Sequence, residues 1–177
     1  MLKISSVNYD FSSVQLDFPK KIADKVINWG KKNIDENDIY NDPDDDSLGR
    51  EDNIHVTVKF GLHTSNPEEV KKVIEGFGEI PLKLGKVSKF DTNDDFDVIK
   101  IDIESDKLHQ LNKLISKELE CTDTHPKYIP HATVAYVTKG SCKDLVGNKF
   151  FVNEEHSFEN VVFSPKNGKK EKINLLF

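Results

Sequence analysis

This 177-residue sequence has only two cysteines, no long apolar run and no excess of basic residues. Two cysteines, Cys121 and Cys142, are too few to hold a secreted disulfide scaffold together, and they lack the spacing of metal ligands. We therefore expect a reducing, cytoplasmic setting. No apolar run approaches the ~18 residues of a membrane span, and residues 1–6 lack the apolar core of a signal peptide. Neither membrane insertion nor secretion is expected.

Acidic residues outnumber basic ones, with 31 aspartates and glutamates against 25 lysines and arginines and a net charge of −6. Binding of long nucleic acid usually needs a basic face, so we do not expect this protein to bind long nucleic acid. A few local groups can still hold a small nucleotide. A chain of this length buries about 70% of the surface that it exposes when unfolded. It can therefore fold as one monomeric domain, residues 1–177, without a disulfide or a metal.

Apolar periodicity predicts an α+β fold. Strands are predicted at 14–18, 54–61, 82–90, 96–104, 131–137, 161–163 and 173–176, and helices at 19–34, 66–77 and 105–119. These elements do not alternate regularly, which argues against a doubly wound parallel sheet. The acidic stretch 35–53 has no periodicity and predicts a solvated loop, and a soft boundary between two lobes is expected near residues 91–95.

Two of the predicted strands carry the same pattern, since residues 55–60 read HVTVKF and residues 131–136 read HATVAY. Residues two apart on a strand share a face and lie about 6.5–7 Å apart, so each strand presents an imidazole beside a hydroxyl. Two such pairs supply a base, an acid and hydrogen-bond donors for a phosphate undergoing in-line attack, and this chemistry requires no metal or other cofactor. The candidate catalytic residues are His55, Thr57, His131 and Thr133.

These paired motifs resemble the 2H phosphoesterase superfamily, which is named for two His-x-Thr/Ser motifs on related halves of one chain. The resemblance covers nearly the whole chain and is strongest to bacterial and phage relatives of the RNA 2′,3′-cyclic phosphodiesterase and 2′-5′ RNA ligase group. It implies a bilobal, pseudo-twofold α+β fold, with two antiparallel sheets lining a central cleft and helices on the outside. It also implies that the four motif residues catalyse metal-independent cleavage of a 2′,3′-cyclic phosphate, or of an oligonucleotide linkage next to a 2′-hydroxyl.

Three further residues are candidate substrate contacts. By strict alternation Lys59 falls on the face of His55 and Thr57, where it would offer a cation to the phosphate, although a lysine reaching solvent at the rim is as good an interpretation. Tyr128, in a proline-bounded loop, is a candidate for stacking on a base or simply for packing. Gln15 is a candidate for lining the cleft from the first strand. The same alternation puts Phe60 and Tyr136 in the core.

Several functions stay open on this basis. The leading hypothesis is a phosphodiesterase for a small ribonucleotide or short oligonucleotide, with base and acid unassigned between His55 and His131. The first alternative is a phage-type anti-defence protein that degrades or sequesters a cyclic or 2′-5′ nucleotide signal, and the second is a nucleotide-binding protein without catalysis. A histidine-ligated metallophosphoesterase is disfavoured because neither motif adds a carboxylate or a third imidazole at short spacing.

Overall fold

The computed structural model describes residues 11–91 and 94–177, so the segment 1–6 and part of the predicted boundary at 91–95 lie outside the described residues. The strands are β1 (Ser12–Asp17), β2 (His55–Leu62), β3 (Ile80–Phe90), β4 (Phe96–Glu104), β5 (His131–Thr138), β6 (Glu155–Phe158), β7 (Asn160–Ser164) and β8 (Glu171–Asn174). The α-helices are α1 (Lys20–Asn33), α2 (Pro67–Ile74) and α3 (Asp106–Glu118), and short 3-10 turns cover Glu36–Asp38 and Lys143–Leu145. The predicted α+β class is confirmed.

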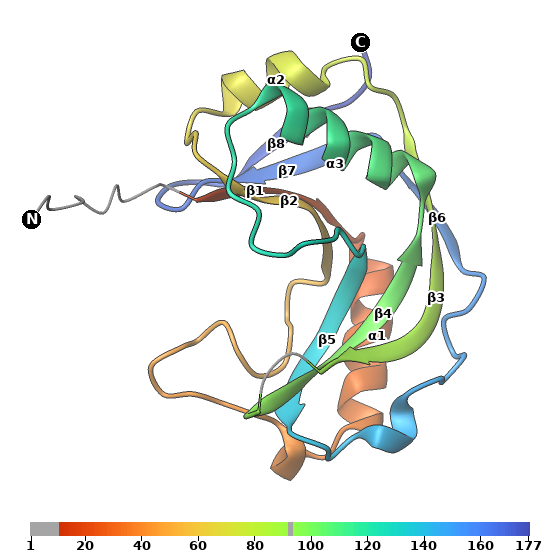
Figure 1. Ribbon diagram of the computed structural model, residues 1–177. Coiled ribbons are helices and arrows are strands. Elements are labelled where there is room, and N and C mark those ends of the chain that lie inside the picture. The colour runs from red at the N-terminus through yellow and green to blue at the C-terminus, as the bar shows by residue number, and fades with distance from the viewer. Residues whose placement is uncertain (1–10, 92–93) are drawn as a thin grey trace, which may run out of the picture.

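All eight strands form one antiparallel sheet in the order β6-β3-β4-β5-β2-β1-β7-β8, which curls so that its two halves face different directions (Figure 1). The two sheets expected from the sequence are therefore the halves of a single sheet, and pairing between β2 and β5 joins them. Strand β6 was not predicted, since Glu155–Phe158 is only four residues long and mostly polar. Strand β6 is an edge strand, and edge strands are often short and polar, so it lacks the apolar alternation that would have predicted it.

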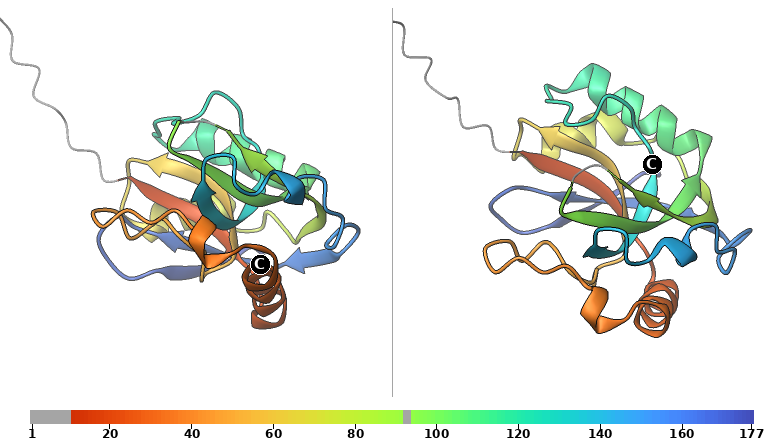
Figure 2. Two further views of the ribbon diagram at one scale, coloured as in Figure 1. Left: turned by 90° about the horizontal axis from the view of Figure 1, so that it is seen from below. Right: turned by 60° about the horizontal axis from the view of Figure 1, so that its bottom comes forward.

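Each motif strand follows a strand–helix unit, β1–α1 before β2 and β4–α3 before β5. The helices are exchanged between the halves, because α1 packs against β5 whereas α3 packs against β2. Gly30 of α1 lies so close to β5 that an added Cβ would come within 2.9 Å of Val134 Cγ1. Asn112 of α3 donates its amide to the Val58 carbonyl of β2, 2.7 Å away. As a result α1 and α3 lie at opposite ends of the molecule (Figures 1 and 2).

Local sequence explains where the helices begin. Asn66 accepts a hydrogen bond from the Glu68 amide, and Pro67 then occupies the first position of α2. Ser105 caps α3 by accepting from the Leu108 amide at 3.2 Å. Among the described residues, no helix is both long and apolar enough to cross a membrane.

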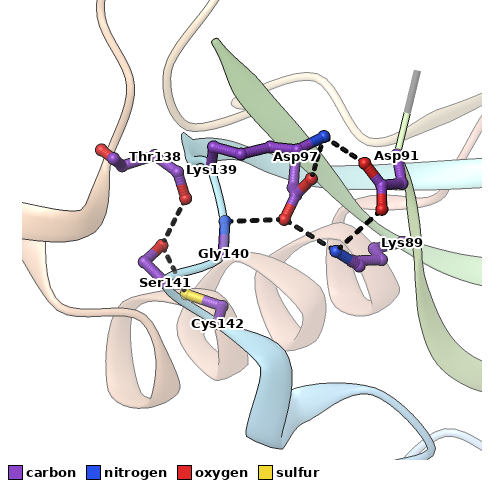
Figure 3. Close-up of polar contacts among 8 residues, drawn as sticks. All are labelled: Lys89, Asp91, Asp97, Thr138, Lys139, Gly140, Ser141 and Cys142. Atoms are coloured by element: carbon purple, nitrogen blue, oxygen red, sulfur yellow. Dashed lines mark hydrogen bonds and ion pairs between the residues drawn. The ribbon is translucent and has the colours of Figure 1, made fainter. Parts of the chain in front are cut away.

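A buried carboxylate ties the β3–β4 hairpin to the end of β5 (Figure 3). Asp97 is 1% exposed and accepts from Lys89 Nζ at 2.9 Å and from the Gly140 amide at 3.0 Å. Lys139 Nζ lies 3.1 Å from its other oxygen and also pairs with Asp91. Burial opposes ionisation of Asp97, but the hydrogen bonds from Lys89, Gly140 and Lys139 prevail and lower its pKa. This network ties β3 and β4 to the end of the strand that carries the second motif.

The acidic stretch 35–53 is attached to the sheet as well as solvated. Ile39 forms a β-bridge to Val137 of β5, and Arg50 forms one to Ala135. Strand β2 pairs with β5 at Ala132, so these bridges occupy the part of the same edge of β5 that β2 does not cover. Residues 43–47 are exposed. The prediction of a solvated loop holds for this central part, whereas its two ends extend the sheet beside the second motif.

Candidate functional site

The two motifs meet at the centre of the sheet, where Val56 of β2 lies opposite Ala132 of β5 in antiparallel register. Because opposed residues in such a pair share a face, this register sets His55 across from Thr133 and Thr57 across from His131. Val56 and Ala132 are fully buried against the helices. The four polar residues therefore project together from the opposite face, which we call the motif face.

Both imidazoles are held in the same way. Nδ1 of His55 lies 2.6 Å from the Asn53 carbonyl oxygen, and Nδ1 of His131 lies 2.7 Å from the Ile129 carbonyl oxygen. A carbonyl only accepts, so in each ring Nδ1 carries a hydrogen and Nε2 is the nitrogen free for proton transfer. The backbone two residues upstream thus sets the tautomer and the orientation of each histidine.

The neighbouring strands extend the arrangement with polar residues that continue the pseudo-twofold relationship. On β1, Gln15 pairs with Thr57 and Asp17 pairs with His55. On β4, Lys100 pairs with Thr133 and Asp102 pairs with His131. Each motif histidine therefore has an aspartate beside it, whereas an amide flanks one threonine and an ammonium flanks the other. Gln15 lies on the side of the motif face, is 5% exposed and donates to Asp17 Oδ1 at 2.5 Å.

Lys100 is 4% exposed and is the centre of a polar cluster beside the second motif. Its Nζ lies 2.6 Å from both Ser88 Oγ and Asp102 Oδ1, and 4.5 Å from the centre of the Phe90 ring. That ring in turn stands edge-on to the His131 imidazole, with centroids 4.7 Å apart. Burial lowers the pKa of His131, and the positive charges of Lys100, His55 and His125 lower it further, against the opposing bond to Ile129. This lowered pKa favours the neutral form of His131.

Lys59 does not lie on the motif face, so strict alternation failed at this residue. Between Gln15, which pairs with Thr57, and Val14, which pairs with Lys59, strand β2 contains one additional residue, Val58. This β-bulge turns Lys59 to the side of the fully buried Val14. Lys59 is only 5% exposed, and its Nζ lies 2.5 Å from Asp123 Oδ1. Its ammonium is thus already paired, away from the histidines.

A matching bulge interrupts β5, where Val134 is the additional residue between Thr133 and Ala135. After each bulge the aromatic residue of the motif returns to the motif face. Phe60 pairs with Ser13, which alternates with Gln15 on β1, and Tyr136 pairs with Val98, which alternates with Lys100 on β4. Phe60 is 46% exposed and Tyr136 is partly exposed. The prediction that both residues belong to the core was wrong, because two inserted residues shift the side-chain period.

Tyr128 supports the first motif through its hydroxyl. The hydroxyl donates to the Thr57 carbonyl at 2.9 Å, and the ring stands edge-on to His109 of α3, 5.3 Å away. Burial raises the pKa of this hydroxyl. The packing interpretation of Tyr128, rather than base stacking, fits these contacts.

In the parts of the chain that are described, 11–91 and 94–177, no cluster of three or more histidine, cysteine, aspartate or glutamate side chains is arranged to hold a metal ion. The polar groups on the motif face are imidazoles, hydroxyls, the Lys100 ammonium, the Gln15 amide and the two flanking carboxylates. Such a set suits proton transfer and binding of a phosphate.

Known structures share this fold. TT0787 of Thermus thermophilus aligns over 93% of this chain and 97% of its own with a TM-score of 0.66 at 14% identity. LigT of E. coli aligns over 95% and 96% of the two chains with a TM-score of 0.65 at 15% identity. Usb1 of Kluyveromyces marxianus covers 96% of this chain and 100% of its own with a TM-score of 0.56 at 11% identity. The chain therefore shares the fold of these three proteins.

Sequence comparison adds one relative. The Staphylococcus haemolyticus protein named "Putative phosphoesterase SH1944" is 29% identical over 100 residues, which are 52% of this chain and 59% of that protein. The match thus spans somewhat more than half of the relative. No family model matches the chain.

Sequence reasoning missed the groups that β4 contributes to this candidate site. Lys100 and Asp102 alternate with Ile99, Ile101 and Ile103 in the middle of β4. Charged residues are rarely buried in a strand unless they have a function or a partner. The two charged residues between the isoleucines could therefore have indicated that β4 contributes to the site.

Proposed function

We propose that this 2H-type chain is a metal-independent phosphodiesterase that acts on a small ribonucleotide by two-histidine acid–base catalysis. The observation that supports it best is the register around Val56 and Ala132, which sets each motif histidine across from the threonine of the other motif. Structures of LigT from E. coli, which has the same fold, hold 3′-AMP, phosphate, ATP and NADP+. A nucleotide phosphate is therefore a suitable ligand for this face.

In this proposal His131 is the general base. Its lowered pKa keeps Nε2 unprotonated at neutral pH, so that it accepts a proton from the attacking oxygen, which belongs to water or to the substrate's 2′-hydroxyl. As the new P–O bond forms and the bond to the leaving oxygen breaks, protonated His55 delivers its Nε2 proton to the leaving oxygen. General acid and base catalysis of this kind contributes about 10²–10⁴-fold for each group, or about 5–11 kcal/mol of barrier for the two together.

The remaining groups stabilise charge. Thr57 and Thr133 donate their hydroxyls to the non-bridging oxygens, on which negative charge builds in the transition state. Lys100, buried beside Thr133, adds a fixed positive charge next to the same oxygens, and Asp102 and Ser88 hold its ammonium in place.

A cleavage screen with the purified protein tests the function. It should include 2′,3′-cyclic nucleotides, 2′-5′ oligoadenylates, 3′-5′ oligonucleotides and cyclic dinucleotides, with products identified by mass. We expect cleavage of at least one class, and activity that is unchanged in EDTA. Activity lost in EDTA and restored by a divalent ion would favour a metallophosphoesterase instead. Tight binding with unmodified ligand recovered after denaturation would favour sequestration.

A further inference from the structure

Two aromatic residues share the motif face with the histidines without any role in the proposed chemistry. Phe60 and Tyr136 are neither part of the hydrophobic core nor among the partly buried residues packed against it. Both reach this face through the paired bulges at Val58 and Val134. A bulge re-aims side chains and costs one pair of ladder hydrogen bonds, so its repetition in both motif strands requires an explanation.

The two rings stand on opposite sides of the histidines. Strands β2 and β5 run antiparallel, and because of the bulges each aromatic lies three ladder positions beyond the central pair of Val56 and Ala132, about 10 Å along its own strand. Phe60 therefore lies beyond Thr57 and His131, whereas Tyr136 lies beyond Thr133 and His55. A phosphate held between the histidines has one aromatic ring on either side of it.

Each ring belongs to a small aromatic group. Phe60 has Phe11 beside it, with centroids 6.0 Å apart. Tyr136 stands edge-on to Phe96 at 5.5 Å, and Phe96 lies 5.2 Å from Tyr40. The bases of single-stranded nucleic acids commonly stack on exposed aromatic rings. These two rings lie on a partly exposed face, on either side of the residues proposed to bind the phosphate.

We propose that Phe60 and Tyr136 are base-stacking platforms on the two sides of the scissile phosphate, so that the preferred substrate is a short single-stranded oligonucleotide and not a 2′,3′-cyclic mononucleotide. A mononucleotide whose phosphate lies between the histidines can bring its only base to one platform at most. A chain with nucleosides on both sides of the phosphate can reach both. This inference rests on the proposed function of the same site.

The acidic stretch limits how long that oligonucleotide can be. The stretch runs beside this platform, because the Tyr136 amide donates to the Gly49 carbonyl at 2.8 Å and the Glu51 amide donates to the Val134 carbonyl at 3.0 Å. Burial raises the pKa of the Tyr136 hydroxyl, and the negative charges of Glu51 and Asp45 raise it further. The same charges repel additional phosphates on that side. A few nucleotides are therefore favoured over a long strand.

The test uses the single variants Phe60→Leu and Tyr136→Leu, with Phe60→Tyr and Tyr136→Phe as variants that keep a ring. Phe150→Leu is a matched control, since this aromatic is 54% exposed and contacts Phe151 and Lys25 of α1, away from the motif face. We expect each leucine variant to lower kcat/KM for the tetranucleotide r(AAAA) by about 5- to 100-fold, the usual loss when one stacking ring is removed. Cleavage of adenosine 2′,3′-cyclic phosphate should change less than twofold in at least one of them, and the ring-keeping variants should retain activity on r(AAAA).

A second substrate sharpens the comparison. A tetranucleotide that lacks all of its bases should be a poorer substrate for the wild-type protein and should be insensitive to both leucine substitutions. If the leucine variants lower cleavage of this compound as much as that of r(AAAA), or if they leave r(AAAA) cleavage unchanged, the platforms do not exist.

Binding separates this inference from the catalytic proposal. The affinity for 2′-O-methyl r(AAAA), which lacks the internal nucleophile, should fall in both leucine variants and remain unchanged in Phe150→Leu. A wild-type protein that binds this probe through both rings but cleaves nothing would contradict the proposed function alone. A protein that cleaves nucleotides but binds the probe equally well in all variants would contradict the platforms alone.

Discussion

Lys100 of β4 stands beside Thr133 in the position that Gln15 of β1 holds beside Thr57. The backbone around the two motifs is nearly symmetric, but these two residues differ by a full charge. The pseudo-twofold site is therefore electrostatically asymmetric, and the positive charge lies on the side of His131. Together with the burial of His131, this difference distinguishes the two imidazoles.

The first prediction concerns this charge. A cation next to an imidazole disfavours protonation, so replacing Lys100 by glutamine should raise the pKa of His131. Because the base must be neutral, the acidic limb of the pH profile of kcat/KM should then move to higher pH, from a wild-type position below the usual histidine value of about 6.5. NMR titration of the His131 ring checks the same change directly.

Lys83→Gln is the control for that experiment, since Lys83 lies on β3 with a partly exposed side chain paired to Glu155. It should leave both limbs in place. An acidic limb that stays at its wild-type pH in Lys100→Gln would mean that His131 is not the base or that Lys100 does not act on it.

The second prediction addresses the histidines. Either His55→Ala or His131→Ala should reduce kcat by about 10²-fold or more, since each removes a proton-transfer group. His63→Ala is a suitable control, because this histidine belongs to neither motif and its ring contacts Thr122. Steady-state kinetics on the best substrate of the cleavage screen measures the effect. Full activity in either motif variant would end the two-histidine mechanism.

Threonine hydroxyls are the subject of the third prediction. Thr57→Val and Thr133→Val keep the side-chain shape but remove the donor to the phosphate oxygens, and we expect a loss of about 10²-fold in kcat for each. Thr57→Ser and Thr133→Ser should recover most of the activity. If serine and valine variants behave alike, the methyl group and not the hydroxyl is the important part of these residues.

The fourth prediction is about stability. Asp97→Asn removes the charge that Lys89 and Lys139 share, and we expect a loss of about 1–3 kcal/mol in the free energy of unfolding at pH 7. A carboxylate with a lowered pKa stabilises the fold above its unfolded pKa of about 3.9, and this contribution disappears as the pH falls through the folded value. The difference between wild type and variant in urea unfolding should therefore shrink at strongly acidic pH.

Asp94→Asn, an exposed residue of the adjacent turn, provides the comparison and should unfold like the wild type. Equal stability of Asp97→Asn and wild type at pH 7 would show that the network in Figure 3 does not stabilise the hairpin.

The two motif strands, the strand–helix unit before each of them and the four residues at their starts could all be predicted from the amino-acid sequence. These features depend on local information: the alternation of Val56 and Val58 with His55 and Thr57, the cap at Ser105 and the helical spacing of Leu108, Leu111 and Ile115. Short-range geometry fixes such patterns, and every tertiary arrangement has to satisfy them.

The groups that surround the motifs could not be predicted in this way and became visible in the folded sheet. The extra residues Val58 and Val134 turned Lys59 away from the histidines and brought Phe60 and Tyr136 toward them, because one inserted residue reverses every later side chain of a strand. Likewise, Lys100 became a neighbour of His131 through the pairing of β4 with β5, which joins residues about thirty positions apart. Pairing partners and bulges arise from the balance of packing over the whole sheet, and no short stretch of sequence contains that balance.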